Sequence, residues 1–545
     1  MAIYQSPIPD QVIPQTNAYS FAVSNPNSMK DSHPILTDAL TKRVITFGEW
    51  KRDTRRWATG LQSLGFKRGD VVALFSFNQV DYSITMFGPI LLGGIATTVN
   101  SAYTADELAF QLKDSDASVI VTHPELLPVA IEGAKKVGLP LSKVFLYGNK
   151  EVDGFKPYSA TFPPENIAED LLAPVEDLNG QAAIESIAVI CYSSGTTGKS
   201  KGVELTHFNL ISNIMQIASV ERGIDMLKVT ALAVVPMYHV YGIQFHIIHG
   251  VYNGVKTVVL QKFNPVDFLK AIQEYKIVSL NLVPPQILML VKAPIVDQYD
   301  LSSLRFITSG AAPCSRELSM TLLKKFPKIQ LRQGYGMSEL SSVSHLGLYN
   351  RAIHGTVGHV LPNQEIRLID PETGKDVGVG ERGEIWVRGP NVMKGYRNNV
   401  KATKDTIDSE GWLHTGDIAT VDMDGNFFIV DRLKELIKYK GFQVAPAELE
   451  ALLLDHPLII DAAVSGIENK EQATEVPLAF VVKAPGEGQA LTEKDIQDYV
   501  ASNVAAHKKL RGGVRFIEVI PKSAAGKILR RELRVLLQEP IMAKL

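Results

Sequence analysis

The chain contains little cysteine. Of its 545 residues, only Cys191 and Cys314 are of this type, and both stand among apolar neighbours. Two cysteines cannot build a disulfide framework, which small secreted proteins use in place of a large core. Neither cysteine has histidine or cysteine neighbours at the spacing of a metal site. We therefore expect both to be structural thiols, in a protein of a reducing compartment.

An excess of charge of one sign is also lacking. The 56 lysines and arginines nearly cancel the 58 aspartates and glutamates, so the formal net charge is −2. No overall field can therefore attract nucleic acid or an anionic membrane, and any cationic site must be local. Hydrophobic residues make up 45% of the chain and charged residues 21%, which are the proportions of a globular protein.

Long hydrophobic runs are scarce as well. The first residues lack the charged and apolar regions of a signal peptide. Residues 82–99 carry no charge and are long enough to cross a bilayer, but Gly88, Pro89, Gly93 and Gly94 interrupt them. These interruptions favour a buried helix that runs into a loop over a membrane span.

Short β-rich runs alternate with helical patterns over most of the chain. Strands are predicted at 71–75, 118–121, 144–147, 231–235, 257–260 and 278–282, with helices from 106, across 127–137 and around 209–220. This alternation predicts an α/β fold of parallel sheets with helices on both faces, and the length requires more than one core. From about residue 357, short strands between Gly, Pro and Asp turns predict a smaller antiparallel β subdomain. Beyond residue 431 the pattern becomes mixed α+β.

The most informative segment is the loop of residues 192–202, Tyr-Ser-Ser-Gly-Thr-Thr-Gly-Lys-Ser-Lys-Gly. It follows the apolar run 187–191 and precedes a helical stretch that starts near Thr206. Its glycines let the backbone bend back, so that hydroxyls, N–H groups and a lysine can face a polyanion. A flexible linker, the alternative, would not stand between a buried strand and a helix. The candidate ATP-binding residues of this loop are Ser193, Ser194, Gly195, Thr196, Thr197, Gly198 and Lys201.

A P-loop ATPase or kinase is the rival interpretation of this loop. Gly198-Lys199-Ser200 matches the end of a Walker A motif, but Ser193 stands where that motif needs its first glycine. The two interpretations differ in their products. The P-loop enzyme would release ADP, whereas an adenylating enzyme would release AMP and pyrophosphate.

Five further motifs follow the loop. They are Pro-Met-Tyr-His-Val-Tyr-Gly at 236–242, Gln-Gly-Tyr-Gly-Met-Ser-Glu at 333–339, Gly-Trp-Leu-His-Thr-Gly-Asp at 411–417, the stretch from Asp431 to Glu448, and Pro-Lys-Ser-Ala-Ala-Gly-Lys at 521–527. In this order they make nearly the whole chain resemble the adenylate-forming superfamily, closest to 4-coumarate–CoA ligases and firefly luciferase. The resemblance implies an N-terminal domain, residues 1–430, of two helix-flanked, mainly parallel sheets plus a β subdomain at about 357–430. A hinge at 431–434 and a small mobile α+β C-terminal domain at 435–545 would follow.

The same resemblance implies an ATP-dependent acid–CoA ligase. Such an enzyme converts a carboxylate, ATP and CoA into an acyl-CoA, AMP and pyrophosphate through an acyl-adenylate. Glu339 would be the carboxylate ligand of Mg²⁺. Asp417 would accept hydrogen bonds from the ribose with Arg432 nearby, and Ser338, where the family usually has Thr, would contact the α-phosphate. The other positions that match the nucleotide motifs are Gln333, Gly334, Tyr335, Lys434 and Gln443.

Two lysines would serve the two half-reactions. Lys527 resembles the lysine that balances charge during adenylation, and Lys438 resembles the lysine presented during thioester formation. The family exchanges them by rotating the C-terminal domain about a hinge, where Lys434 matches the pivot. The candidate CoA-binding residues are Lys262, Lys440 and Gly441.

The resemblance also implies an acyl pocket. His239 would stand at its carboxylate end and orient the anion, although a histidine among apolar residues is more often a core side chain. Tyr241, two residues on, would point to the same face of an extended segment and resembles the residue that meets the aromatic hydroxyl in 4-coumarate ligases. The floor of the pocket would be formed by Gly310, Ala311 and Gly334.

The sequence leaves the identity of the acid open. Thr308 stands where plant ligases often have Lys, and Leu-Ser-Ser at 340–342 replaces the Ala-Gly-Pro run of hydroxycinnamate enzymes. 4-Coumarate or a related aryl acid is the first hypothesis and a medium- or long-chain fatty acid the second, with a luciferase-like oxygenase more remote. An inactive scaffold would have lost Lys527, Glu339 or Asp417, and all three are present.

The last three residues, Ala543-Lys544-Leu545, are a variant of the Ser-Lys-Leu signal that a peroxisomal import receptor reads. They follow the last predicted helix after Pro540, which would leave them free to bind the receptor. We therefore expect a peroxisomal address, and otherwise the cytosol.

Overall fold

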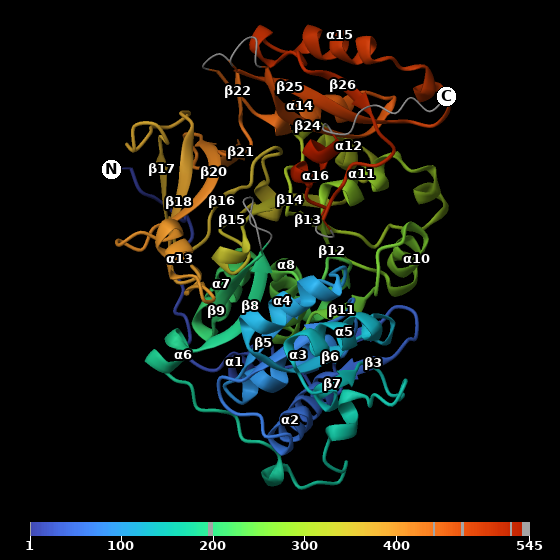
Figure 1. Ribbon diagram of the computed structural model, residues 1–545, viewed down its shortest axis with the longest axis vertical. Coiled ribbons are helices and arrows are strands. Elements are labelled where there is room, and N and C mark those ends of the chain that lie inside the picture. The colour runs from blue at the N-terminus through green and yellow to red at the C-terminus, as the bar shows by residue number, and fades with distance from the viewer. Residues whose placement is uncertain (1, 194–199, 440–441, 470–473, 524–525, 537–545) are drawn as a thin grey trace.

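The computed structural model describes residues 2–193, 200–439, 442–469, 474–523 and 526–536 (Figure 1). Several predicted site residues lie outside these ranges: Ser194, Gly195, Thr196, Thr197, Gly198, Lys440 and Gly441. Lys199, to which the sequence assigns no role, and the terminal residues 543–545 lie outside them as well.

A seven-stranded sheet is built in the order β19-β9-β8-β5-β4-β6-β7. Its strands are β4 (Val71–Phe75), β5 (Ile95–Val99), β6 (Ala117–Thr122), β7 (Val144–Leu146), β8 (Ile187–Ser193), β9 (Lys201–Thr206) and β19 (Gly395–Tyr396). The five strands from β8 to β7 run parallel, whereas β9 and β19 are antiparallel to their neighbours. The strands predicted at 71–75, 118–121 and 144–147 are confirmed.

A nine-stranded sheet has the order β16-β15-β14-β13-β12-β10-β11-β2-β3. Its strands are β2 (Pro34–Asp38), β3 (Val44–Thr46), β10 (Thr230–Ala233), β11 (Lys256–Val259), β12 (Ser279–Leu282), β13 (Phe306–Ser309), β14 (Gln330–Tyr335), β15 (His345–Leu346) and β16 (His359–Val360). The inner strands from β14 to β2 pair in parallel. This agrees with the predicted α/β fold.

Helices cover both faces of the sheets. They are α1 (Ala18–Ala22), α2 (Phe47–Ser63), α3 (Tyr82–Leu91), α4 (Ala105–Ser115), α5 (Leu127–Val137), α6 (Gln181–Glu185), α7 (His207–Val220), α8 (Val240–Gly242), α9 (His249–Asn253), α10 (Pro265–Tyr275), α11 (Pro284–Lys292), α12 (Arg316–Lys325) and α13 (Val400–Thr406). Val71 and Phe75 of β4 pack with α4 and α5. Val72 and Leu74, on the other face, join a larger core with α2 and α3 that also takes in Val259 of the nine-stranded sheet. The two sheets thus share one core.

A five-stranded antiparallel sheet has the order β1-β17-β18-β20-β21. Its strands are β1 (Tyr4–Gln5), β17 (Glu365–Ile369), β18 (Gly383–Arg388), β20 (Leu413–Val421) and β21 (Phe427–Arg432). The antiparallel character of this region is as predicted, but the strand at Val360 belongs instead to the nine-stranded sheet, as part of β16. β1 was not predicted. It pairs with β17 at one edge, and β21 carries the chain into the C-terminal region.

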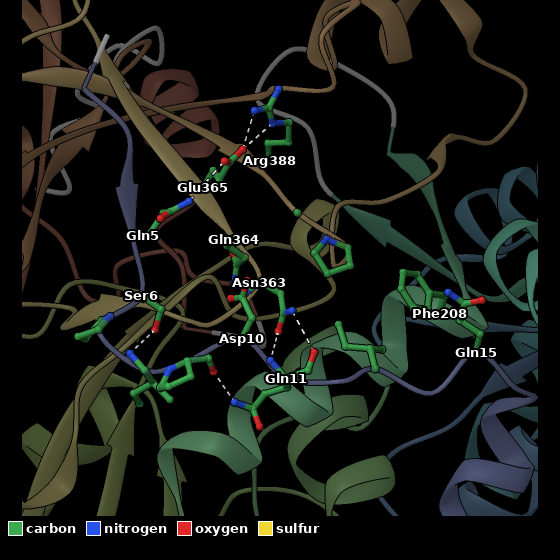
Figure 2. Close-up of a pocket in the computed structure, with 16 residues that line it drawn as sticks. Gln5, Ser6, Asp10, Gln11, Gln15, Phe208, Asn363, Gln364, Glu365 and Arg388 are labelled. Carbon is green, nitrogen blue, oxygen red and sulfur yellow. Dashed lines mark hydrogen bonds and ion pairs between the residues drawn. The ribbon is translucent and has the colours of Figure 1, made fainter.

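The segment that follows β1 borders an open groove of about 780 Å³ (Figure 2). Asn363, just before β17, fastens this segment: its side chain accepts a hydrogen bond from the Gln11 backbone N–H and donates one to the Gln11 carbonyl. Its own N–H donates to Asp10. The first residues of the chain are therefore tied to the five-stranded sheet.

The C-terminal residues form a separate layer with its own hydrophobic core, at the red end of the chain in Figure 1. They make a hairpin of β22 (Ile437–Tyr439) and β23 (Phe442–Val444), a sheet of β24 (Ile459–Asn469), β25 (Thr474–Lys483) and β26 (Gly513–Phe516), and helices α14 (Pro446–Asp455), α15 (Glu493–Asn503) and α16 (Arg530–Leu536). The mixed α+β character agrees with the sequence pattern.

Residues 82–91 form helix α3, and a short loop at 92–94 follows it, so the predicted helix and loop are confirmed; strand β5, which comes next, was not predicted. All residues of both elements are buried within the fold. In the described part of the chain, no helix has both the length and the apolarity that a membrane span requires.

Candidate active site

The strands on either side of the predicted phosphate loop, β8 and β9, pair as an antiparallel hairpin. Ser193 at the end of β8 pairs with Lys201 at the start of β9. Helix α7 begins only after β9, where the Thr206 hydroxyl caps it by accepting a hydrogen bond from the Asn209 N–H. The helix predicted to start near Thr206 is confirmed, but strand β9, which lies between the loop and this helix, was not predicted. A Walker A loop joins a strand to a helix, so this geometry contradicts the P-loop interpretation.

Glu339 lies next to this hairpin, in the short 3₁₀ helix η8 (Ser338–Leu340). Its Oε1 atom accepts hydrogen bonds from the Ser193 hydroxyl at 3.2 Å and the Tyr396 hydroxyl at 2.9 Å. Burial raises the pKa of Tyr396, so this hydroxyl stays protonated and acts as the hydrogen-bond donor to Glu339. The Lys201 ammonium lies 4.6 Å above the Tyr396 ring. Tyr396 was missed in the sequence, because it reaches the site only through the pairing of β19 with β9.

The arrangement around Glu339 fits the predicted Mg²⁺ ligand. Within the described ranges, Oε2 accepts no hydrogen bond and remains available as an oxygen ligand. In the same ranges, no group of three or more acidic, histidine or cysteine side chains could hold a metal by itself. Mg²⁺ commonly binds through one or two carboxylates together with substrate phosphates. The site therefore suits an ion that arrives with a nucleotide.

Asp417 lies beside Arg432, as the sequence predicted, and Tyr335 joins this pair. Asp417 on β20 and Arg432 on β21 are directly paired in the sheet, and the Arg432 Nε lies 3.3 Å from Asp417 Oδ1. The Tyr335 hydroxyl donates to Asp417 Oδ2 at 2.7 Å. Because both carboxylate oxygens are held, their orientation is fixed and their remaining lone pairs can accept from a ribose diol.

The backbone between β14 and Glu339 is tightly constrained. A Cβ atom at Gly336 would lie 1.6 Å from the Ser342 carbonyl oxygen, so only glycine fits there. The Gln333 amide accepts from the Cys314 N–H and donates to the Cys314 carbonyl. Gln333 therefore fixes the loop after β13. Ser338 is buried at the start of η8, one residue before the carboxylate.

His239 precedes the short helix α8, and its Nδ1 accepts a hydrogen bond from the Tyr241 N–H at 3.2 Å. Burial, together with the nearby charge of Lys527, lowers the pKa of His239 to about 4. The ring is therefore neutral at pH 7, with its proton on Nε2. This N–H can donate to an anionic substrate.

The expectation that His239 and Tyr241 share the face of an extended segment is wrong. Only His239 has extended backbone, because Val240–Gly242 is already helical. The Tyr241 hydroxyl donates to the Thr308 carbonyl oxygen at 3.2 Å. Its ring packs edge-to-face against Phe245, with centroids 5.1 Å apart. Tyr241 thus connects α8 with the end of β13.

Of the predicted floor residues, Gly334 lies on β14, while Gly310 and Ala311 follow the end of the neighbouring strand β13. A side chain at Gly310 would lie against the Tyr241 ring, because its Cβ would stand 3.3 Å from two ring carbons. A Cβ at Gly334 would approach Leu346 Cδ1 to 3.0 Å. Ala311 has a φ of 66°, an uncommon conformation for a residue with a side chain. Glycine at 310 thus lets the Tyr241 ring lie close to the backbone that follows β13.

A buried charged cluster behind this floor was missed in the sequence. Arg332 forms ion pairs with Glu221, which also pairs with His249 at 2.8 Å, and the Arg332 Nε donates to the Thr308 hydroxyl. Burial opposes ionisation of Glu221, but the charges of His249 and Arg332 lower its pKa to about 2. Arg332 and Thr308 are paired in the sheet. The cluster therefore connects β13 and β14 close to Gly310 and Gly334.

Lys527 reaches the site from the C-terminal residues. Burial and the charge of Arg432 lower the pKa of its ammonium group to about 8, although Asp417, Glu435 and Glu339 act in the opposite direction. The neighbouring Gly526 packs closely on the large N-terminal part, since a Cβ there would lie 3.0 Å from Val283. Lys527 therefore shares the electrostatic environment of Asp417 and Glu339.

Among the described residues, the other predicted hinge and CoA lysines lie at the surface. Lys434 and Lys438 are exposed, and Lys438 pairs with Gln443 in the hairpin of β22 and β23. Lys262 is exposed and forms an ion pair with Glu125 at 2.9 Å. The structure thus brings Lys527 to Glu339 and Asp417 and leaves Lys438 at the surface.

Comparison with known proteins gives two family matches. A model of the AMP-binding enzyme family matches residues 27–397. A model of the AMP-binding enzyme C-terminal domain matches residues 448–527. Together they include most of the residues described above.

Curated relatives are similar over nearly their whole length. The chain is 40% identical over 551 residues to a protein named probable 4-coumarate–CoA ligase 1 of Dictyostelium discoideum, covering 97% of each chain. It is 39% identical over 553 residues to 4-coumarate–CoA ligase 1 of Narcissus pseudonarcissus, covering 98% of this chain and 96% of the relative.

Among solved structures, the o-succinylbenzoate CoA synthetase of Bacillus subtilis in complex with its acyl-adenylate intermediate has the same fold. Its TM-score is 0.76 at 25% identity, over 96% of this chain and 99% of that one.

Proposed function

Because this chain belongs to the AMP-binding enzyme family, we propose that it is an ATP-dependent acid–CoA ligase that activates 4-coumarate or a related aryl acid. The observation that carries the proposal is that the charges of Glu339 and Asp417 both act on the buried ammonium group of Lys527. These side chains come from three distant parts of the sequence. They supply a metal ligand, a ribose acceptor and a cation, which are the groups that adenylation requires.

In the first half-reaction, an oxygen of the acid's carboxylate attacks the α-phosphorus of ATP. A P–O bond forms, the bond to the leaving pyrophosphate breaks, and acyl-AMP results. Two anions must approach each other for this attack, so the Lys527 ammonium would reduce their repulsion. The Nε2–H of His239 would hold the acid's carboxylate, and Asp417 would fix the ribose.

When bound, Mg²⁺ would supply neutralisation of the phosphate charge. We propose Glu339 as its protein ligand, through the oxygen that Ser193 and Tyr396 do not hold. Ser193 and Lys201 would keep the two strands of the hairpin in place on either side of the phosphate loop.

In the second half-reaction, the sulfur of CoA attacks the acyl carbon. A C–S bond forms, the bond to the AMP oxygen breaks, and the thiol proton is released. Lys438 is exposed in the present arrangement. Its use would require the C-terminal residues to rotate about 431–434, with Lys434 at the pivot. Lys262, Lys440 and Gly441 remain the proposed contacts for CoA.

An aryl acid is supported by the named relatives. Gly310 lies close to the buried Tyr241 ring, and a Cβ atom there would stand only 3.3 Å from two ring carbons. Apolar side chains surround Tyr241, among them Val235, Phe245 and Leu346. These contacts favour a slender, mostly apolar acid.

The test is a screen of aryl and fatty acids with ATP, Mg²⁺ and CoA. With an acid labelled by ¹⁸O in its carboxylate, we expect labelled AMP, pyrophosphate and an acyl-CoA. A preference of at least about tenfold in kcat/KM for 4-coumarate over a fatty acid of similar length would support the aryl assignment. ADP as the product, or unlabelled AMP, would contradict adenylation.

We also propose that the terminal Ala543-Lys544-Leu545 directs the protein to peroxisomes. The support is the match to the receptor-read signal. A fluorescent protein fused to the N-terminal side should appear in peroxisomes. The same fusion with one extra residue after Leu545 should stay in the cytosol, and peroxisomal import of that blocked form would contradict the proposal.

A further inference from the structure

The position of the Lys527 ammonium group depends on contacts made by other residues. Its pKa is lowered, and within the described ranges no ion pair or hydrogen bond holds its ammonium group. The residue lies in a tight turn: the Ser523 N–H donates to the Lys527 carbonyl at 2.8 Å, and the Leu529 N–H donates to the Pro521 carbonyl at 2.9 Å. The orientation of the ammonium group therefore depends on the contacts that hold this turn in place.

Ion pairs hold the turn at both ends. On the N-terminal side, the Lys522 ammonium lies 2.7 Å from both oxygens of Asp461. On the C-terminal side, the Arg530 guanidinium lies 2.9 Å from Glu435 and 2.6 Å from Glu450. The second set is the more buried, since its three side chains are only 11–17% exposed.

Arg530 is also fixed by the backbone. Its Nε donates to the Val464 carbonyl at 3.1 Å, while the N–H of Val464 donates to Glu450 at 2.8 Å. The planar guanidinium thus has three acceptors in a fixed arrangement. A lysine could not reproduce this geometry.

Glu435 connects this arrangement to the active site. It follows Lys434 directly, and its N–H donates to the carbonyl of Arg432 at 2.9 Å. Arg432 in turn pairs with Asp417, the candidate ribose ligand. A continuous chain of contacts therefore runs from the ribose site through Arg432 and Glu435 to Arg530, three residues beyond Lys527.

Stability alone does not account for this cluster. Burial raises the pKa of Glu450 to about 7, even though Arg530 opposes the shift, and burial also raises the pKa of nearby Asp431. Three carboxylates near one arginine are costly to bury, and a packed apolar cluster can be as stable. The cluster does, however, hold the turn that carries Lys527 in one defined position.

We propose that Arg530 is a positioning residue for adenylation, which holds the turn of Lys527 in register with the Asp417–Arg432 pair. This inference rests on the proposed function. Arg530 does not touch the substrate and acts only through Lys527. Its loss should therefore slow the step that uses Lys527 and spare the step that does not.

The test compares Arg530→Met with Arg534→Met. Arg534 lies on the same helix α16 but is exposed, so the control has the same change of charge and side chain. Acyl-adenylate formation is measured by pyrophosphate exchange, and thioester formation from supplied acyl-AMP. For Arg530→Met we expect a kcat of adenylation about 10- to 100-fold lower, an unchanged KM for ATP within about threefold, and thioester formation within about twofold. Arg534→Met should match the wild type.

The decisive comparison combines Arg530→Met with Lys527→Ala in a double variant. If Arg530 acts through Lys527, then Arg530→Met should add less than about twofold to the loss in Lys527→Ala. A full additional loss would overturn the proposal, as would equal losses in both half-reactions. Glu435→Gln, which removes one of the two carboxylate partners, should show a smaller loss of the same pattern and serves if Arg530→Met does not fold.

The outcome separates this inference from the proposed function. A wild type that forms no acyl-adenylate with any acid would overturn both. A wild type that forms it, with Arg530→Met equally active, would overturn only the role of Arg530.

Discussion

Two turns of the C-terminal region each present a lysine, and their surroundings differ. Lys527 is enclosed between the C-terminal residues and the large N-terminal part, where burial lowers its pKa to about 8. Lys438 stands exposed on β22. Among the described residues, its N–H donates a hydrogen bond to Glu475 and its carbonyl accepts one from the Thr474 hydroxyl. The contrast teaches that one arrangement of the chain can serve only one of these lysines. The structure is the arrangement that serves Lys527.

Helix α14 shows how this arrangement is held. Its N-terminal residue Ala445 provides no side-chain cap, and the Asp431 carboxylate instead accepts a hydrogen bond from the Ala447 N–H at 3.0 Å. At the other end, the Lys292 ammonium of α11 donates to the carbonyls of Leu454 and Ile459. An anion at the N-terminus and a cation at the C-terminus both complement the helix dipole.

The largest effect is expected for Lys527→Ala. Removal of the cation should lower the rate of adenylation by about 10²–10³-fold, because a preorganised charge at the reacting phosphate is lost. Thioester formation from supplied acyl-AMP should change by less than about threefold. Separate assays of the two half-reactions measure this difference.

Lys438→Ala should give the reverse pattern. We expect thioester formation to fall by about 10- to 100-fold and adenylation to stay within about threefold, because Lys438 lies outside the present site. If each variant impaired both half-reactions to the same extent, the distinction between the two turns would not hold.

A pH profile sharpens the comparison further. Because the pKa of Lys527 is lowered to about 8, the group loses its charge as the pH rises above 8. The kcat/KM of adenylation should therefore fall about fivefold between pH 8 and pH 9, and about tenfold for each further pH unit, with one proton lost. Lys527→Arg should abolish this limb of the profile, and thioester formation from acyl-AMP should lack it. An unchanged limb in Lys527→Arg would assign the titration to another group.

The smallest effect is expected for Lys292→Met, which removes the contact at the C-terminal end of α14. A charge at a helix terminus contributes about 0.3–1 kcal/mol, so adenylation should fall by about two- to fivefold. Lys324→Met, at an exposed lysine near the end of α12, is the matched control. A loss as large in the control would show that surface charge, and not this contact, is responsible.

Much of the fold could be predicted because its signals are local. Buried strands such as Val71–Phe75 are continuous apolar runs, and the helices between them have amphipathic patterns. Strand β9 was missed because only Val203 and Leu205 give it an apolar face, directly before a strong helix start at Thr206. Strand β1 has only two residues, and its partner is 360 residues away, so no local signal marks it.

The site residues divide in the same way. Asp417, Tyr335 and Arg432 stand in motifs, and the structure brings them into contact. Tyr396 and Arg530 were not identified, because a tyrosine after a glycine or an arginine in a basic helix carries no signal of its own. The prediction for Tyr241 was wrong. A spacing of two residues places side chains on one face only in a strand, whereas helix α8 begins between His239 and Tyr241.

The pairing of β1 with β17 has a consequence for the order of synthesis. Gln5 and Glu365 are paired in the sheet and lie 360 residues apart. At about 5–20 residues per second, a ribosome would make Glu365 roughly 20 to 70 seconds after Gln5. The first residues to leave the ribosome must therefore wait for nearly two thirds of the chain before they find their strand. If synthesis stalled before residue 365, strand β1 would remain unpaired, even if the residues between β1 and the ribosome had already folded.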